Sequence, residues 1–117
     1  MVEVSFEIDA PPPVRHDAGR CADRSSPNAL PLFQIASHHV AMNPGAFPIR
    51  ARVAVVITSA EPFDEPDGYS IATAVEEVLI DAGVLADERL VVTHRHEIRP
   101  NMDGYSVSLQ PSGARAP

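Results

Sequence analysis

Residues 51–58 form an apolar run with the sequence Ala-Arg-Val-Ala-Val-Val-Ile-Thr, in which β-branched side chains dominate. A short continuous run of this kind is typical of a strand whose two faces are both buried. Such a strand lies inside a sheet, because an edge strand has at least one solvated side. We therefore expect 51–58 to be the central strand of the fold, covered by other elements.

The segment after Ser70 predicts a helix that covers this strand. Ser70 is a good N-cap residue, and Gly83 stands where a left-handed C-cap belongs. Apolar residues recur between them at helical spacing, at Ile71, Ala74, Val75, Val78, Leu79 and Ala82. If this stripe packs on the central strand, its members and their partners become nearly fully buried, in particular Val55, Ile57, Val75, Val78 and Leu79.

The remaining segments predict three further strands and one further helix. Residues 2–9 alternate between apolar and polar, which indicates a half-buried strand that the prolines from Pro11 onward terminate. A helix follows from Pro31 to the Asn43-Pro44-Gly45 stop, with Leu32, Ile35, Ala36, His39 and Val40 on its apolar side. Strands at 90–98 and 105–109 flank Asp103-Gly104, a hairpin-turn signal.

These elements define one α+β domain over 1–117, with the order β-α-β-α-β-β. We expect a mixed sheet of three to four strands with two helices packed mainly on one face. Residues 10–30 are polar and aperiodic and predict a long loop. The tail 111–117, rich in Pro, Gly, Ser and Ala, predicts a flexible end.

Charge and composition restrict the functional classes. The chain has sixteen acidic residues and nine basic ones, all of them Arg, and its formal net charge is −7. Such a domain is a poor non-specific binder of nucleic acid, because phosphate contacts dominate that affinity. The single cysteine, Cys21, forms no intramolecular disulfide. No apolar run could span a bilayer and no signal peptide is evident, so we expect a cytoplasmic protein.

Acidic residues concentrate between Glu61 and Glu88, where there are nine of them and no basic residue. One group precedes the second helix and the other, Asp87 and Glu88, follows it. Converging carboxylates are the hard oxygen ligands that Mg²⁺ and Mn²⁺ prefer. The alternative interpretation is a solvated acidic loop and helix face, and the residues alone leave both open.

The spacing of residues 67–91 is similar to the signature of the RusA family of Holliday-junction endonucleases. It reads Asp67-x-Tyr69-Ser70-x-x-Thr73-x-x-x-Glu77-x-x-x-x-x-Gly83-x-x-x-Asp87-Glu88-x-x-Val91. The family pattern has Asp-x-Asp-Asn-x-x-Lys-x-x-x-Asp, a helix ending at Gly, then Asp-Asp and an apolar strand. The opening strand that runs into Pro11-Pro12 also resembles the family.

This resemblance implies a small dimeric α/β domain whose acids bind Mg²⁺ and hydrolyse phosphodiesters in four-way DNA junctions. By position it makes Asp67, Asp87 and Glu88 the metal ligands and catalytic residues, and it matches Glu77 to an acidic helical position. The pattern is broken at two chemical groups. Tyr69 stands for the second Asp, and a phenol does not ligate Mg²⁺ near neutral pH. Thr73 stands for the Lys and lacks its charge.

Two functions follow from this comparison. In the first, the chain is a catalytically degenerate RusA-like module that binds or regulates a protein partner, and it needs no cofactor. In the second, it is a divergent structure-selective DNA endonuclease that uses Mg²⁺ or Mn²⁺. Asp64 or Glu65 would then complete the ligand set, since Glu65-Pro66-Asp67 restores an acid-x-acid pair. In the degenerate case, the Tyr69 ring fills the vacated ligand position, and the remaining acids turn to water or to Arg89.

The histidines carry weaker signals. His38 and His39 lie on the first helix, and we interpret His39 as a core or interface residue. His94 and His96 share one face of a strand and could hold Zn²⁺, although packing or surface roles are more common. With Arg95 and Arg99 they make a locally basic run that could face an anion. We interpret Cys21 as a bystander in the polar loop.

Overall fold

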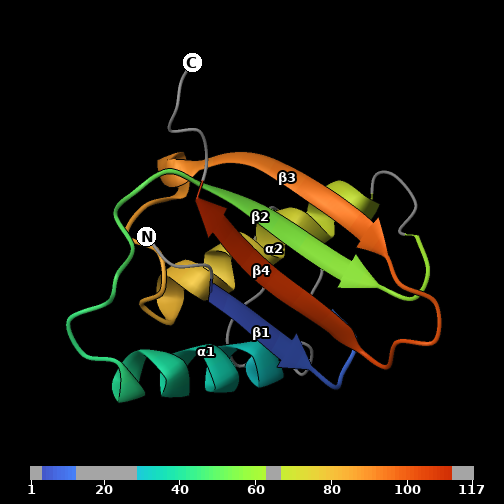
Figure 1. Cartoon of the computed structure of the whole chain (residues 1–117), viewed down its shortest axis with the longest axis horizontal. Helices are drawn as coiled ribbons and strands as arrows, with labels where there is room; N and C mark the ends of the chain where they lie inside the picture. The colour runs from blue at the N-terminus through green and yellow to red at the C-terminus, as the bar shows by residue number, and fades with distance from the viewer. Residues whose placement is uncertain (1–3, 13–28, 63–66, 112–117) are drawn as a thin grey trace.

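The computed structural model of the 117-residue chain describes residues 4–12, 29–62 and 67–111, and the side chains of 67–70 are not described. The elements follow one another as β1 (Val4–Ile8), α1 (Leu30–Met42), β2 (Val53–Ser59), α2 (Asp67–Asp81), the single 3₁₀ turn η1 (Glu88–Leu90), β3 (Val91–Ile98) and β4 (Tyr105–Pro111) (Figure 1). The expected α+β class and the order β-α-β-α-β-β are confirmed. Most of the expected 10–30 loop and of the 111–117 tail lies outside the described residues.

The four strands form one mixed sheet in the order β1-β4-β2-β3. β2 pairs with β3 in parallel and with β4 in the antiparallel sense, and β1 pairs antiparallel with β4. β2 is therefore internal, and all seven of its residues are buried. The prediction of a central strand buried on both faces is confirmed.

The expected hairpin between 90–98 and 105–109 is wrong, because β2 lies between β3 and β4. The Asp103-Gly104 turn does reverse the chain direction, but the returning strand enters the sheet on the other side of β2. The apolar side chains of β2 account for this arrangement: a strand buried on both faces gains most from a neighbour along each edge. Turn residues determine the reversal and leave the pairing partner open.

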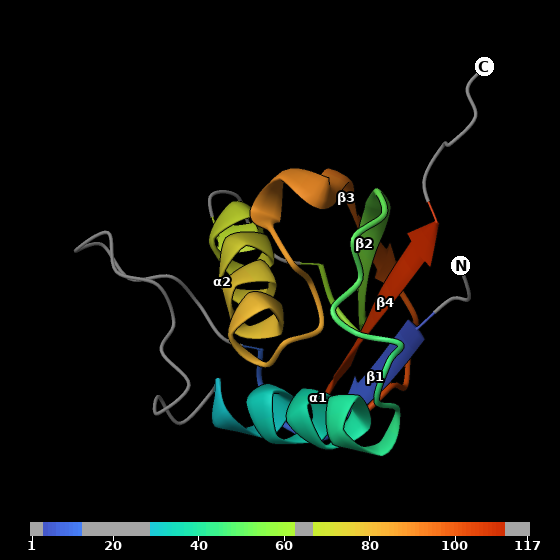
Figure 2. The same cartoon turned by 90° about the vertical axis from the view of Figure 1, so that its left-hand side faces the viewer.

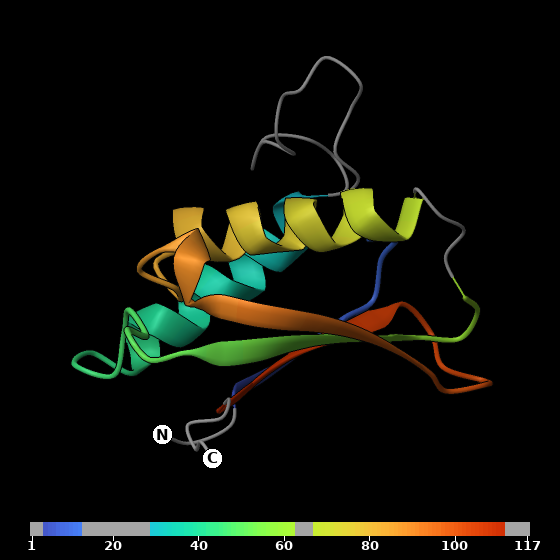
Figure 3. The same ribbon diagram turned by 90° about the horizontal axis from the view of Figure 1, so that it is seen from above.

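Both helices pack on the same face of the sheet, as the sequence predicts (Figure 3). α1 also contacts β1 and α2 (Figure 2). The interface between α2 and the sheet is the core of the protein, and the five residues expected there, Val55, Ile57, Val75, Val78 and Leu79, are at most 3% exposed. On α1 the apolar stripe is narrower than expected, because Leu32 and Ala36 are buried while Ile35 is 38% exposed.

The helix ends follow local chemistry. α2 begins at Asp67 rather than after Ser70, so the expected N-cap lies within its first turn. Gly83 has the positive φ of 87° that a C-cap needs, and the Val84 backbone N–H donates to the Leu79 carbonyl at 2.9 Å. At the end of α1, the Asn43 side-chain amide donates to the carbonyl of His39 at 2.8 Å.

Within the described residues no helix covers the opposite face of the sheet, yet Val56 on that face is only 2% exposed. Arg95 of β3 donates to Gln110 of β4 at 3.3 Å, and these two strands lie on either side of β2. By register, Arg95 stands beside Val56 and Gln110 beside Ala54. The two long side chains therefore form a bridge over the central strand.

Candidate functional site

Asp87, one of the acids singled out by the family resemblance, is held by Arg89. Its Oδ1 accepts from the Arg89 backbone N–H at 2.8 Å, and its Oδ2 accepts from Arg89 Nη2 at 2.7 Å. These hydrogen bonds, first of all those from the side chain, lower the pKa of Asp87 to about 2. The expectation that an acid of this group turns to Arg89 is confirmed, and both carboxylate oxygens have a partner.

Of the other expected ligands, the structure describes the backbone of Asp67 and the whole of Glu88. Asp67 opens α2, whose 15 residues span roughly 20 Å. Its side chain, like those of Tyr69 and Ser70, lies outside the described residues, as do Asp64 and Glu65. Glu88 is exposed on η1, which packs back against α2. Among the described residues, no three His, Cys, Asp or Glu side chains form a metal-binding group.

An acid that the sequence did not single out, Glu76, occupies the middle of α2 and contacts His94 of β3 through its Oε2 and the His94 Nε2. The Glu76 side chain is only 13% exposed. Burial, and then the charges of Glu88 and Glu77, raises its pKa to about 7. Burial also lowers the pKa of His94. Burial therefore disfavours the charged form of both partners of this pair.

Ser59 and His96 form a second pair on the same side of the sheet. Ser59 Oγ lies 2.7 Å from His96 Nε2 and 2.7 Å from the Glu61 carbonyl oxygen. A hydroxyl has a single proton, and the carbonyl only accepts, so Ser59 donates to Glu61. His96 Nε2 must then carry the proton and donate to Ser59. In this arrangement His96 is a positioning partner and not the base that a nucleophilic serine requires.

The histidine expectations are resolved by these contacts. His94 and His96 do share one face of β3, but they contact different partners, Glu76 and Ser59. Arg95 points to the opposite face, toward Glu97 and Gln110, so the expected basic run is divided between two faces. His39 is half-buried, with its ring edge-on between Phe6 and Phe47 at centroid distances of 5.3 and 5.6 Å. Cys21 lies outside the described residues.

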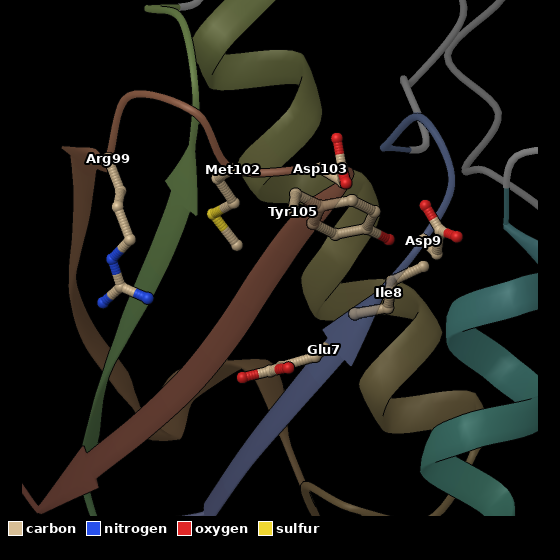
Figure 4. Close-up of a pocket in the computed structure, with 7 residues that line it drawn as sticks. All are labelled: Glu7, Ile8, Asp9, Arg99, Met102, Asp103 and Tyr105. Carbon is tan, nitrogen blue, oxygen red and sulfur yellow. The ribbon is translucent and has the colours of Figure 1, made fainter.

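A pocket of about 400 Å³ opens where β1 ends and β4 begins. Figure 4 shows Asp103 and Asp9 near Tyr105, Glu7 farther back along β1, and Arg99 across the pocket from Asp9. Asp9 also lines a neighbouring hollow of about 430 Å³ beside Gly104. Sequence reasoning missed this site, because its residues come from the two ends of the chain and join only through the β1–β4 pairing.

No protein-family model matches the chain, and no curated protein matches it either. Across the described residues, the helices are all too short or too polar to cross a membrane.

Proposed function

We propose that this chain is a RusA-like protein that acts as a binding or regulatory module and not as a metal-dependent nuclease. The observation that carries the proposal is that two acidic side chains of this region already have partners within the chain. Asp87 forms an ion pair with Arg89, and Glu76 contacts His94. A carboxylate whose two oxygens already accept from a guanidinium is a poor ligand for Mg²⁺ unless that contact breaks. Tyr69 and Thr73 supply neither a ligand nor a phosphate-binding charge in place of the missing Asp and Lys.

The charge of the chain favours a protein partner over DNA. A net charge of −7 without any Lys offers few contacts to phosphates, which dominate the affinity of junction-binding proteins. We expect weak junction binding at physiological salt. A nanomolar affinity with a steep salt dependence would contradict the proposal.

The test combines cleavage and metal binding. The full chain is incubated with a four-way DNA junction in Mg²⁺ and in Mn²⁺, and metal binding is measured by titration calorimetry. We expect no cleavage and no binding tighter than about millimolar. The combination of Tyr69→Asp, Thr73→Lys and Arg89→Ala should bind metal more tightly than the natural chain, since it restores a ligand and a charge and frees Asp87. Cleavage by the natural chain that Asp87→Asn abolishes would overturn the proposal.

One observation favours the second candidate, a divergent Mg²⁺- or Mn²⁺-dependent endonuclease. Glu76, Glu77 and Glu88 lie close enough for the last two to raise the pKa of the first. Glu77 also has a buried carboxylate oxygen, Oε1, without a hydrogen-bond partner. A bound cation would relieve this repulsion. Micromolar Mn²⁺ binding that lowers the pKa of Glu76 would therefore assign the chain to the nucleases.

We further infer that the module assembles as a homodimer through β3. This strand is one of the two edge strands of the sheet, and seven of its eight residues are exposed, including Val92 and Ile98 at 45% and 46%. An antiparallel pair of β3 strands centred on His96 places Arg95 opposite Glu97 of the second copy, twice. Centring on Arg95 instead would oppose two like charges, which destabilises a cross-strand pair.

Charge exchange across this pairing tests the interface. Arg95→Glu and Glu97→Arg, each alone, should shift the chain to monomer in light scattering behind size exclusion, because each opposes like charges twice. The double exchange should restore the dimer. A dimer that survives both single substitutions, or a monomeric natural chain, contradicts the β3 interface.

A further inference from the structure

The two histidines of β3, His94 and His96, lie at the edge of the sheet where the proposed dimer forms (Figure 1). By register they stand beside Val55 and Ile57 on the helix-covered face. Solvent reaches both, since His96 is exposed and the His94 side chain is 39% exposed. Among the described residues, no single copy brings three metal-binding side chains together. A site that uses both imidazoles therefore needs a ligand from a second copy.

The β3 pairing that matches the charges of Arg95 and Glu97 also gathers the histidines. With the pair centred on His96, His96 of one copy stands directly opposite His96 of the second copy, and His94 stands opposite Ile98. Directly opposite residues of an antiparallel pair share one face and have Cβ atoms about 4.5–5.5 Å apart. His94 and His96 of the second copy are diagonal neighbours, about 7–8 Å apart and within reach of long side chains. Imidazoles from both copies can therefore reach one ion.

Each imidazole is anchored to the fold through its Nε2 atom. His96 Nε2 lies 2.7 Å from Ser59 Oγ, and His94 Nε2 contacts Glu76 Oε2. Because Ser59 donates to the Glu61 carbonyl, His96 Nε2 carries the ring proton and Nδ1 does not. A metal-ligating histidine almost always donates its other ring N–H to an acceptor such as a carboxylate, which fixes the orientation of the ring. Ser59 and Glu76 are in this outer position, so a metal ion would bind at Nδ1 of these rings.

We propose that the β3 dimer binds one Zn²⁺ ion between its two copies, with His96 of both copies and His94 of one copy as ligands. This inference rests on the proposed β3 homodimer. Three imidazoles and one water complete the tetrahedral geometry that Zn²⁺ adopts. Imidazole nitrogen suits Zn²⁺, whereas Mg²⁺ prefers oxygen ligands. The ion joins the two copies, so its binding stabilises the dimer by mass action.

The test titrates Zn²⁺ and, for comparison, Mg²⁺ into the metal-free full chain and follows heat by calorimetry and mass by light scattering. Zn²⁺ should bind as one ion for every two chains and raise the dimer fraction, and Mg²⁺ should do neither. His96→Gln removes the ligand while its amide can still donate to Ser59, and Zn²⁺ affinity should fall by more than about a hundredfold. Ser59→Ala removes only the outer partner and should lower it by about 10–100-fold. His38→Ala, an exposed histidine of α1, is the matched control and should leave it unchanged.

The charge-exchange variants separate the zinc site from the dimer on which it rests. Arg95 and Glu97 lie on the opposite face of β3, away from the imidazoles. Arg95→Glu alone should therefore weaken Zn²⁺ binding together with the dimer, and adding Glu97→Arg should restore both. A natural chain that dimerises through β3 but binds Zn²⁺ no more tightly than His96→Gln overturns the zinc site and leaves the dimer standing. A natural chain that stays monomeric in the presence of Zn²⁺ overturns both.

Discussion

Gly104→Ala should displace the end of the first strand, β1, from the start of the last strand, β4, and so destabilise the fold. Gly104 precedes β4 with a φ of +66°, a conformation that L side chains rarely adopt. A Cβ atom built there would lie 2.0 Å from the carbonyl oxygen of Ile8 and 2.9 Å from the Cα of Asp9. Both atoms belong to backbone, so no side-chain rotation relieves the clash. The end of β1 has to move by about 1 Å or more before the contact becomes ordinary.

The expected loss in the free energy of unfolding has two contributions. Forcing an alanine into the left-handed region costs about 1–2 kcal/mol. Displacing β1 strains the Ile8–Tyr105 pairing and opens the packing of Ile8, which is 2% exposed, and overpacking of this kind costs about 1–3 kcal/mol more. We therefore expect Gly104→Ala to lower the free energy of unfolding by about 2–5 kcal/mol. The urea midpoint should fall by about 1–3 M.

Gly45→Ala is the matched control. Gly45 also has a positive φ, +92°, but no atom lies within 4 Å of the position that a Cβ would take there. It should therefore lose only the conformational contribution of about 1–2 kcal/mol. Equal losses in the two variants would show that the close approach of Gly104 to Ile8 contributes nothing to stability.

Three further substitutions test the core and its ionisable groups. Leu79→Ala should cost about 2–5 kcal/mol in urea unfolding, since Leu79 is fully buried, and a loss below about 1 kcal/mol would contradict its place in the core. Glu76→Gln should match the natural chain in melting temperature near pH 4.5 and exceed it above about pH 7, because ionising a carboxyl whose pKa is raised to about 7 opposes folding over that interval. A constant difference across this pH range would refute the assignment. Tyr105→Phe should leave stability unchanged or raise it by about 1–2 kcal/mol, as it removes a buried hydroxyl that has no partner, and a clear loss would mean that the hydroxyl is bonded.

Burial patterns were readable from the sequence because they are local. The β-branched run at 51–58 identified the central strand, and the stripe from Ile71 to Leu79 identified the helix face that covers it. The same reasoning failed at Asp103-Gly104. There the turn residues predicted a reversal correctly, but strand pairing depends on contacts with β2, which no short segment encodes.

In the candidate site too, contacts between near neighbours in the chain could be predicted from the sequence, and contacts between distant residues could not. The contact of Asp87 with Arg89 could be anticipated, since the residues are near neighbours in the chain. The pairs Glu76–His94 and Ser59–His96 could not, because they depend on the parallel register that sets His94 beside Val55 and His96 beside Ile57. A usable signal was present: both histidines have the strand parity of the helix-covered face. What was missing was the strand order.

The pairing of β1 with β4 has a consequence for synthesis on the ribosome. Its register joins Val4 to Leu109, so the first strand of this sheet to emerge waits for the last strand of the same sheet. Until residues 105–111 leave the exit tunnel, β1 has no neighbour and β2, apolar throughout most of its length, keeps one edge open. An open apolar strand is a template for intermolecular pairing. A nascent chain of this protein therefore has to be kept from its neighbours until β4 has emerged, and fragments that stop before β4 should aggregate rather than fold.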